Sequence, residues 1–172
     1  MMLSMENEII NKVDQSGLLQ IDPEQYYVAG ERELLDLTPW LFENVILKEK
    51  IFREHIQTHN WSFYKDKFVA ITCTADAIIP AWAYMIVAAH LSPYAKDFVF
   101  GDLNRLEEYL FMKQLAKIDL NAFQDQRVVI KGCSDLQVPL SAYVEITKLL
   151  QPVAKSVMYG EPCSTVPVFK KK

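Results

Sequence analysis

The sequence predicts an α/β fold: a layered, mostly parallel sheet of about four strands with flanking helices and an N-terminal helical extension. Short apolar runs at 68–72, 98–100, 128–130 and 156–158 are typical of buried parallel strands. The first three runs are each followed by a helical pattern, as in strand–helix–strand units. The chain has 172 residues, is 51% hydrophobic and contains no linker-like stretch, which indicates a single domain over 1–172.

Residues 1–66 are expected to form a mainly helical wrapping segment. Ile9, Ile10 and Val13 recur at helical spacing before Gly17, which would end that helix. Thr38-Pro39 is a helix start, because proline at the first helical position loses no hydrogen bond. We therefore expect helices over 6–16, 40–45 and 48–59, and a short strand over 33–37.

The α/β core is expected over 67–172, with helices at 79–91, 103–117 and 142–150. With its four strands numbered along the chain, right-handed crossovers permit the spatial order 2-1-3-4 in one sheet. The first, third and fourth strands would then end side by side at the carboxyl edge, where open α/β sheets bind ligands.

The three cysteines lie in related turns. The stretch Val128–Pro139 consists of a strand, Cys133, a polar turn and a proline that opens a helix. The same order surrounds Cys73, and a compressed version follows Cys163, so that each cysteine precedes Ser or Thr and then Ile-Pro or Val-Pro. The predicted sheet order would bring these three turns together, which predicts a functional site.

Thiolates suit zinc and iron–sulfur clusters, so we expect a zinc or iron–sulfur site at Cys73, Cys133 and Cys163. Asp76 and Asp135 are the candidate additional ligands, followed by Asp102 and Glu161. The cysteine spacing matches no local zinc-finger or ferredoxin pattern, so this hypothesis depends on the predicted topology.

Other functions remain open. A thiol enzyme or persulfide carrier would use Cys133 or Cys73, which precede predicted helix N-termini where the dipole favours a thiolate, and Lys131 would add positive charge. In a non-catalytic interaction module, the N-terminal helices would dock a partner. The simplest alternative is that all three cysteines are buried structural residues.

Composition argues against several classes of protein. The net charge of −4 and the pI near 5.4 are not those of a nucleic-acid-binding protein. No apolar run is long enough to span a bilayer and no signal peptide is evident, so we expect a cytoplasmic protein with free or metal-bound cysteines and no membrane partner. A homodimer is one expected form.

Other residues with chemical potential have simpler interpretations. His55, His59 and His90 are expected at the surface, since no metalloprotease pattern accompanies them. We expect Trp82, Tyr84 and Tyr143 to pack against the sheet. No motif for a Ser-His-Asp triad or a carboxylate pair is present.

Four segments together resemble an uncharacterised bacterial family, domain of unknown function 2480: residues 5–13, 72–80, 127–147 and 159–167. Relatives of this kind are encoded near iron–sulfur assembly genes of the sulfur-mobilisation type. The resemblance therefore implies an accessory role in cluster assembly, with iron–sulfur assembly proteins as partners, and supplies no catalytic residues.

Overall fold

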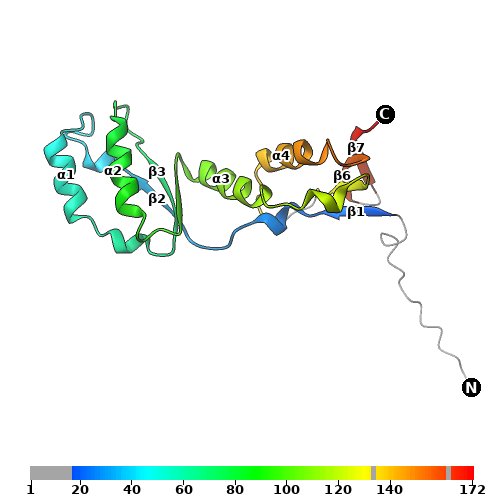
Figure 1. Cartoon of the computed structure of the whole chain (residues 1–172). Coiled ribbons are helices and arrows are strands. Elements are labelled where there is room, and N and C mark those ends of the chain that lie inside the picture. The colour runs from blue at the N-terminus through cyan, green and yellow to red at the C-terminus, as the bar shows by residue number, and fades with distance from the viewer. Residues whose placement is uncertain (1–16, 133–134, 162–163) are drawn as a thin grey trace, which may run out of the picture. The chain divides into compact units, whose positions relative to one another are not determined.

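A computed structural model of the chain describes residues 17–132, 135–161 and 164–172, and confirms the predicted α/β class (Figure 1). The chain forms two compact units. Unit 1 comprises the described residues up to Tyr26 together with Gln114–Lys172, and unit 2 is the continuous segment Tyr27–Lys113. Each unit contains its own, mostly parallel, sheet.

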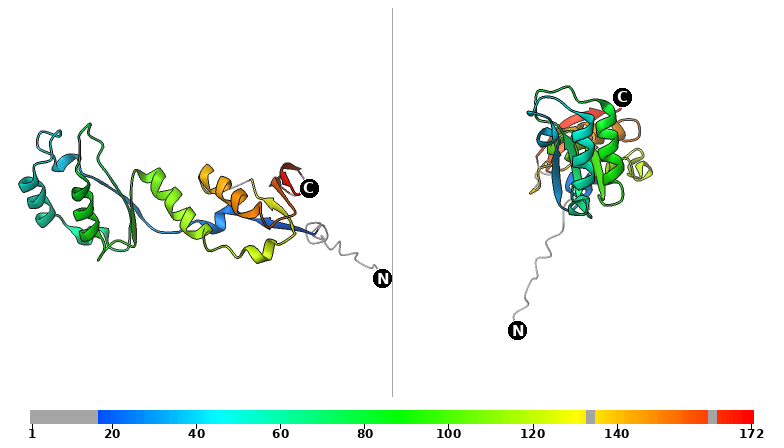
Figure 2. Two further views of the ribbon diagram at one scale, coloured as in Figure 1. Left: turned by 45° about the horizontal axis from the view of Figure 1, so that its top comes forward. Right: turned by 90° about the vertical axis from the view of Figure 1, so that its left-hand side faces the viewer.

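Unit 2 is built on three parallel strands in the order β2-β3-β4: β2 (Arg32–Asp36), β3 (Phe68–Thr72) and β4 (Asp97–Phe100). The central strand β3 is apolar and buried from Phe68 to Ile71, as expected for a strand with both faces covered. α1 (Glu49–Thr58) and α2 (Ala81–Leu91) lie side by side on one face (Figures 1 and 2). α3 (Leu103–Leu115) packs Leu106 and Leu110 on the other.

Unit 1 contains four strands in the order β1-β5-β6-β7: β1 (Leu18–Ile21), β5 (Arg127–Ile130), β6 (Ser156–Glu161) and β7 (Ser164–Lys170). The first three are parallel, and β7 runs antiparallel to β6. α4 (Leu140–Leu150) buries Ala142, Ile146 and Leu150 at helical spacing.

The predicted single sheet with order 2-1-3-4 is wrong. β3 and β4 belong to the sheet of unit 2, whereas β5 and β6 belong to that of unit 1. On its side away from β4, β3 pairs with β2, and on its side away from β6, β5 pairs with β1. Both β2 and β1 come from the segment expected to wrap around the core. The strand expected at 33–37 is β2, whereas the signal of β1 was missed.

Two further expectations concern local structure. The helix expected over 40–45 is replaced by a single 3₁₀ turn, Thr38–Trp40, because Glu43 and Asn44 adopt positive φ values of 52° and 57°. The helix expected over 6–16 lies outside the described residues.

The two units repeat one structural plan. Residues at corresponding places in the two units are 59 positions apart in the sequence. This holds from the 3₁₀ turn before the central strand to the end of the third strand. Pro80 and Pro139, at the starts of α2 and α4, are one such pair. Asp66 and Asp125, also 59 apart, both have positive φ, 60° and 56°. Their N–H groups donate to the equivalent carbonyls of Tyr94 and Val153, at 3.0 and 2.8 Å.

The repeats diverge after an equivalent glycine. Gly101 follows β4 with a φ of 138°, and Gly160 lies near the end of β6 with a φ of 124°. Beyond Gly101 the chain enters α3, whereas beyond Gly160 it returns as β7 along the edge of β6. Unit 1 therefore has a fourth strand that unit 2 lacks.

Unit 2 contains all three tryptophans and all three histidines of the chain, in one aromatic cluster. His59 contacts Trp40 and Trp61, with ring centroids 4.9 Å apart in both cases, and its Nε2 lies 3.0 Å from the Tyr64 hydroxyl oxygen. His55 stacks on Trp40, so the expectation that this pair of histidines lies at the surface is wrong. His90 is exposed in the last turn of α2.

We predict that Gly160→Ala destabilises unit 1 by about 1–3 kcal/mol, because the positive φ is strained for alanine. The new Cβ would also lie 2.5 Å from the Ser164 carbonyl oxygen. Urea unfolding followed by circular dichroism measures the change. Gly17→Ala is the control, since nothing lies within 4 Å of its Cβ position, and an equal loss there would contradict the steric explanation.

The pH dependence of unit 2 should follow His59. Burial, and then the charge of His55, lower the pKa of His59, so the unfolded chain takes up its proton first and stability falls as the pH drops from 7 towards 5. Urea unfolding monitored by tryptophan fluorescence reports unit 2 alone. His59→Gln should flatten this dependence and His90→Gln should not; equal slopes in all three proteins would refute the assignment.

Candidate functional site: the carboxyl edges of the two sheets

At the carboxyl edge of unit 2, the Asp36 carboxylate joins the end of β2 to the loop after β3. It accepts hydrogen bonds from the N–H and hydroxyl of Thr38, at 2.9 and 2.8 Å, and from those of Thr74, at 3.1 and 2.5 Å. Burial alone would raise the pKa of Asp36, but these bonds outweigh it and lower the pKa. With four donors already bound, Asp36 acts as a structural clamp.

Cys73 follows β3 directly and is partly buried. Its Sγ lies 3.7 Å from the Thr38 hydroxyl oxygen and 4.0 Å from the Ala75 carbonyl oxygen. Tyr84 packs edge-on against Phe100, with ring centroids 5.0 Å apart. Burial, followed by the charges of Cys73 and Asp36, raises the pKa of Tyr84.

The equivalent edge of unit 1 carries more charge. Glu24 accepts hydrogen bonds from the N–H groups of Asp135 and Leu136, the latter at 2.9 Å, as Asp36 does for the loop of unit 2. Asp22 pairs with Lys131 at 2.9 Å. The hydrogen bond to Asp22 raises the pKa of Lys131, with added contributions from the charges of Asp22, Glu24 and Glu161.

Gly132 and Gly160, which precede Cys133 and Cys163 in the sequence, lie close together in unit 1, whereas both cysteines lie outside the described residues. A Cβ placed on Gly132 would be 3.3 Å from the Cα of Gly160. Cys133 comes immediately after Gly132, and Cys163 lies between Glu161 and Ser164, which face each other across β6 and β7. Glu161 Oε1 is buried with no hydrogen-bond partner among the described residues.

The other predicted ligands lie in three different loops. Asp76 is exposed in the loop before α2, and Asp102 accepts the Arg105 N–H at 2.8 Å near the start of α3. Asp135 is exposed in unit 1. Within the described ranges, no three His, Cys, Asp or Glu side chains come close enough to bind one metal ion. The convergence of all three cysteines remains a prediction.

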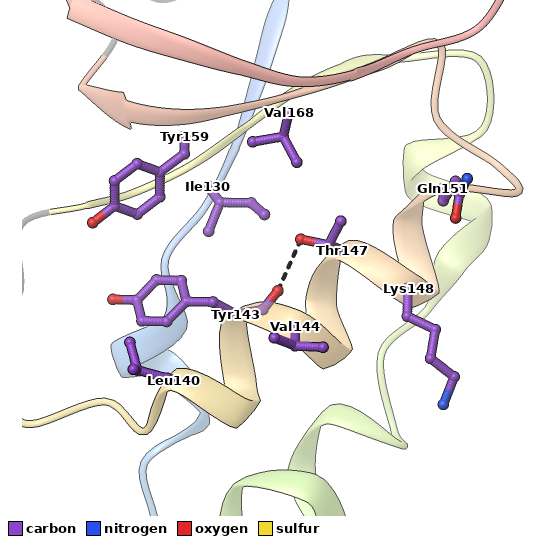
Figure 3. Close-up of a pocket in the computed structure, with 9 residues that line it drawn as sticks. All are labelled: Ile130, Leu140, Tyr143, Val144, Thr147, Lys148, Gln151, Tyr159 and Val168. Atoms are coloured by element: carbon purple, nitrogen blue, oxygen red, sulfur yellow. Dashed lines mark hydrogen bonds between the residues drawn. The ribbon is translucent and has the colours of Figure 1, made fainter.

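An apolar cavity of about 520 Å³ adjoins this edge of unit 1, between α4 and the strands (Figure 3). Tyr143 and Tyr159 form one wall, with ring centroids 5.8 Å apart and nearly perpendicular planes. The Tyr159 hydroxyl donates to the Gly132 carbonyl at 3.4 Å. Lys148 lies at the far end of the cavity, and the hydroxyls of both tyrosines point away from it (Figure 3). The two tyrosines thus connect the cavity with the loop that precedes Cys133.

The carboxylates that hold these loops were missed in the sequence. Asp22-Pro23-Glu24 and Asp36-Leu37-Thr38 occupy equivalent positions, because Ile21 pairs with Ile130 in unit 1 and Leu35 pairs with Ile71 in unit 2. The signal that could have identified them in the sequence is an acidic residue directly after a short apolar run, which occurs at Asp22 and again at Asp36. The expected packing role of the tyrosines agrees with the structure, since Tyr84 and Tyr143 each contact the third parallel strand.

We expect Asp36→Ala to cost unit 2 about 1–3 kcal/mol at neutral pH, because four hydrogen-bond donors lose their acceptor. Since the pKa of Asp36 is lowered, its contribution is present above the ordinary value near 3.8 and is lost as the pH falls through the folded value. Urea unfolding of the two proteins should therefore converge in acid. A constant difference at every pH would argue against the charged clamp.

No helix among the described residues has both the length and the apolar character needed to cross a membrane. No curated protein and no solved structure matches the chain. The sequence does match, over residues 7–171, the model of the family described as "Protein of unknown function (DUF2480)". Because this match covers nearly the whole sequence, the chain belongs to that family.

Proposed function

We propose that the chain binds a metal ion or an iron–sulfur cluster through its cysteines, in the cytoplasm, and serves as an accessory of iron–sulfur cluster assembly. The observation that carries this proposal is the close approach of Gly132 and Gly160 at the carboxyl edge of unit 1. Two thiol-bearing segments leave adjacent parallel strands there, which favours Cys133 and Cys163 as a pair of ligands. Thiolates are the ligands that zinc and iron–sulfur clusters prefer.

The surrounding donors suit such a group. The buried Glu161 Oε1, which has no partner among the described residues, would supply an oxygen ligand two residues before Cys163 in the sequence. Glu24 holds the backbone of the loop after Cys133 in place. Asp135, whose N–H binds Glu24, remains a candidate ligand as well.

Cys73 belongs to unit 2, so it enters this proposal as the third ligand only in the three-cysteine form that the sequence predicts.

A thiol enzyme or persulfide carrier is the second candidate function. The position of Cys73 supports it, because this partly exposed sulfur lies directly after β3 at the carboxyl edge of the sheet, 3.7 Å from the Thr38 hydroxyl oxygen.

We expect protein purified without oxygen to contain a metal or a cluster, as measured by elemental analysis and visible absorption. Cys133→Ser and Cys163→Ser should each weaken binding more than about tenfold, since each removes a ligand. Cys73→Ser is the matched control. If it also loses the metal, the three-cysteine site is supported.

The opposite outcome is equally specific. A metal-free wild-type protein whose three thiols all titrate would refute metal binding. Fast alkylation of one cysteine at neutral pH would then support the thiol enzyme. Full physiological function of the triple serine variant would indicate a non-catalytic interaction module.

A further inference from the structure

One edge of the unit 2 sheet is open. β4 pairs with β3 on one side, and no strand among the described residues pairs with its other side. The equivalent strand in unit 1, β6, is covered at this edge by the antiparallel strand β7. The internal repeat therefore shows that a strand in this position accepts an antiparallel neighbour.

The backbone of β4 offers hydrogen-bonding groups to this open side. The Gly101 N–H donates to the Ile71 carbonyl of β3 at 2.9 Å. Because successive residues of a strand alternate in direction, the N–H and C=O groups of Phe98 and Phe100 point away from β3. In unit 1, Tyr159 is equivalent to Phe100, and it pairs with Val166 of β7.

The side chains beside this edge are unusually apolar for a surface. Phe100 is 63% exposed and Met85, on the adjacent helix α2, is 68% exposed. Both lie on the α2 side of the sheet, where Phe100 contacts Tyr84. Exposed edge strands with apolar side chains readily pair with another chain.

We propose that β4 pairs antiparallel with β4 of a second copy of this chain, with Val99 at the two-fold axis. In this register Phe98 faces Phe100 of the partner subunit, so both residues with outward-pointing backbone groups form hydrogen-bonded pairs. The two exposed aromatic patches meet on the α2 side. The pairing is isologous and closes as a dimer with one continuous sheet of six strands.

Charge complementarity identifies a second copy as the occupant. The same register places Lys96 opposite Asp102 of the partner subunit, at both ends of the pairing. Lys96 is exposed and makes no ion pair within the described residues, contacting only the Phe68 ring at 5.1 Å. Asp102 is exposed at the start of α3. Residues of opposite charge thus flank β4, and antiparallel self-pairing would bring them together.

Formation of the dimer would replace one hydrogen bond within the chain by one between the two copies. The Phe98 N–H now donates to its neighbour Asp97 Oδ1 at 2.9 Å, and in the dimer it would donate across the strands. Asp97 retains Lys113 at 2.5 Å and the Tyr109 hydroxyl at 3.2 Å, so its carboxylate stays satisfied. The exchange therefore leaves no unpaired charge.

Sedimentation equilibrium of the full chain tests the proposal. We expect the wild-type protein to have twice the 19.9 kDa mass of one chain. Lys96→Glu and Asp102→Lys should each weaken the dimer at least tenfold, because each places two like-charged pairs in the interface. Mixing the two variants should restore it, because every pair is then opposite in charge. Failure of the mixture to associate would overturn the antiparallel register.

A second pair of variants separates this edge from other surfaces. Phe100→Glu should give monomers, whereas Leu140→Glu, which alters an 82% exposed residue of unit 1, should leave the dimer intact. Circular dichroism melting establishes that each variant is folded, and the mixing experiment remains decisive if Phe100→Glu is not. A monomeric wild-type protein, or a dimer disrupted only by Leu140→Glu, would refute the β4 interface.

Discussion

Hydrogen bonding at the carboxyl edge of each sheet determines where the cysteine loops lie. A loop that leaves a central parallel strand has backbone N–H groups with no ladder partner, and these need acceptors. In both units a carboxylate at or just after the end of the neighbouring strand provides them: Asp36, the last residue of β2, in unit 2 and Glu24, in the turn after β1, in unit 1. Because the acceptor comes from a segment distant in sequence, each cysteine loop depends on correct pairing of its sheet.

The sequence revealed four of the parallel strands and the helices after the first three, since β3 and β5 are short, mostly buried apolar runs. It did not reveal which strands share a sheet. Right-handed crossovers restrict the connection between two strands of one sheet, but they do not decide whether α3 leads to the same sheet or to another. β1 was missed because Leu18–Ile21 is interrupted by the polar Gln20 and is mostly exposed.

The internal repeat is visible in contacts more than in residue types. Asp66 and Asp125 have the same backbone conformation and make equivalent hydrogen bonds. The strands that follow them nevertheless differ in sequence: Phe-Val-Ala-Ile-Thr at Phe68–Thr72 and Arg-Val-Val-Ile at Arg127–Ile130. The turns at Cys73 and Cys133 are similar in sequence, and this similarity led to the prediction that they meet at one edge of a single sheet. The internal repeat accounts for the similarity in another way, because each unit builds its own edge from the same plan.

The order of the units along the chain has a consequence for biosynthesis. Unit 2 is one uninterrupted segment, whereas β1 and β5, neighbours in unit 1, are separated by all of it. As the polypeptide emerges from the ribosome, Tyr27–Lys113 can complete its sheet before β5, the partner of β1, has been synthesised. The nascent protein is therefore expected to fold from its middle outward, with the amino-terminal strand among the last to be incorporated.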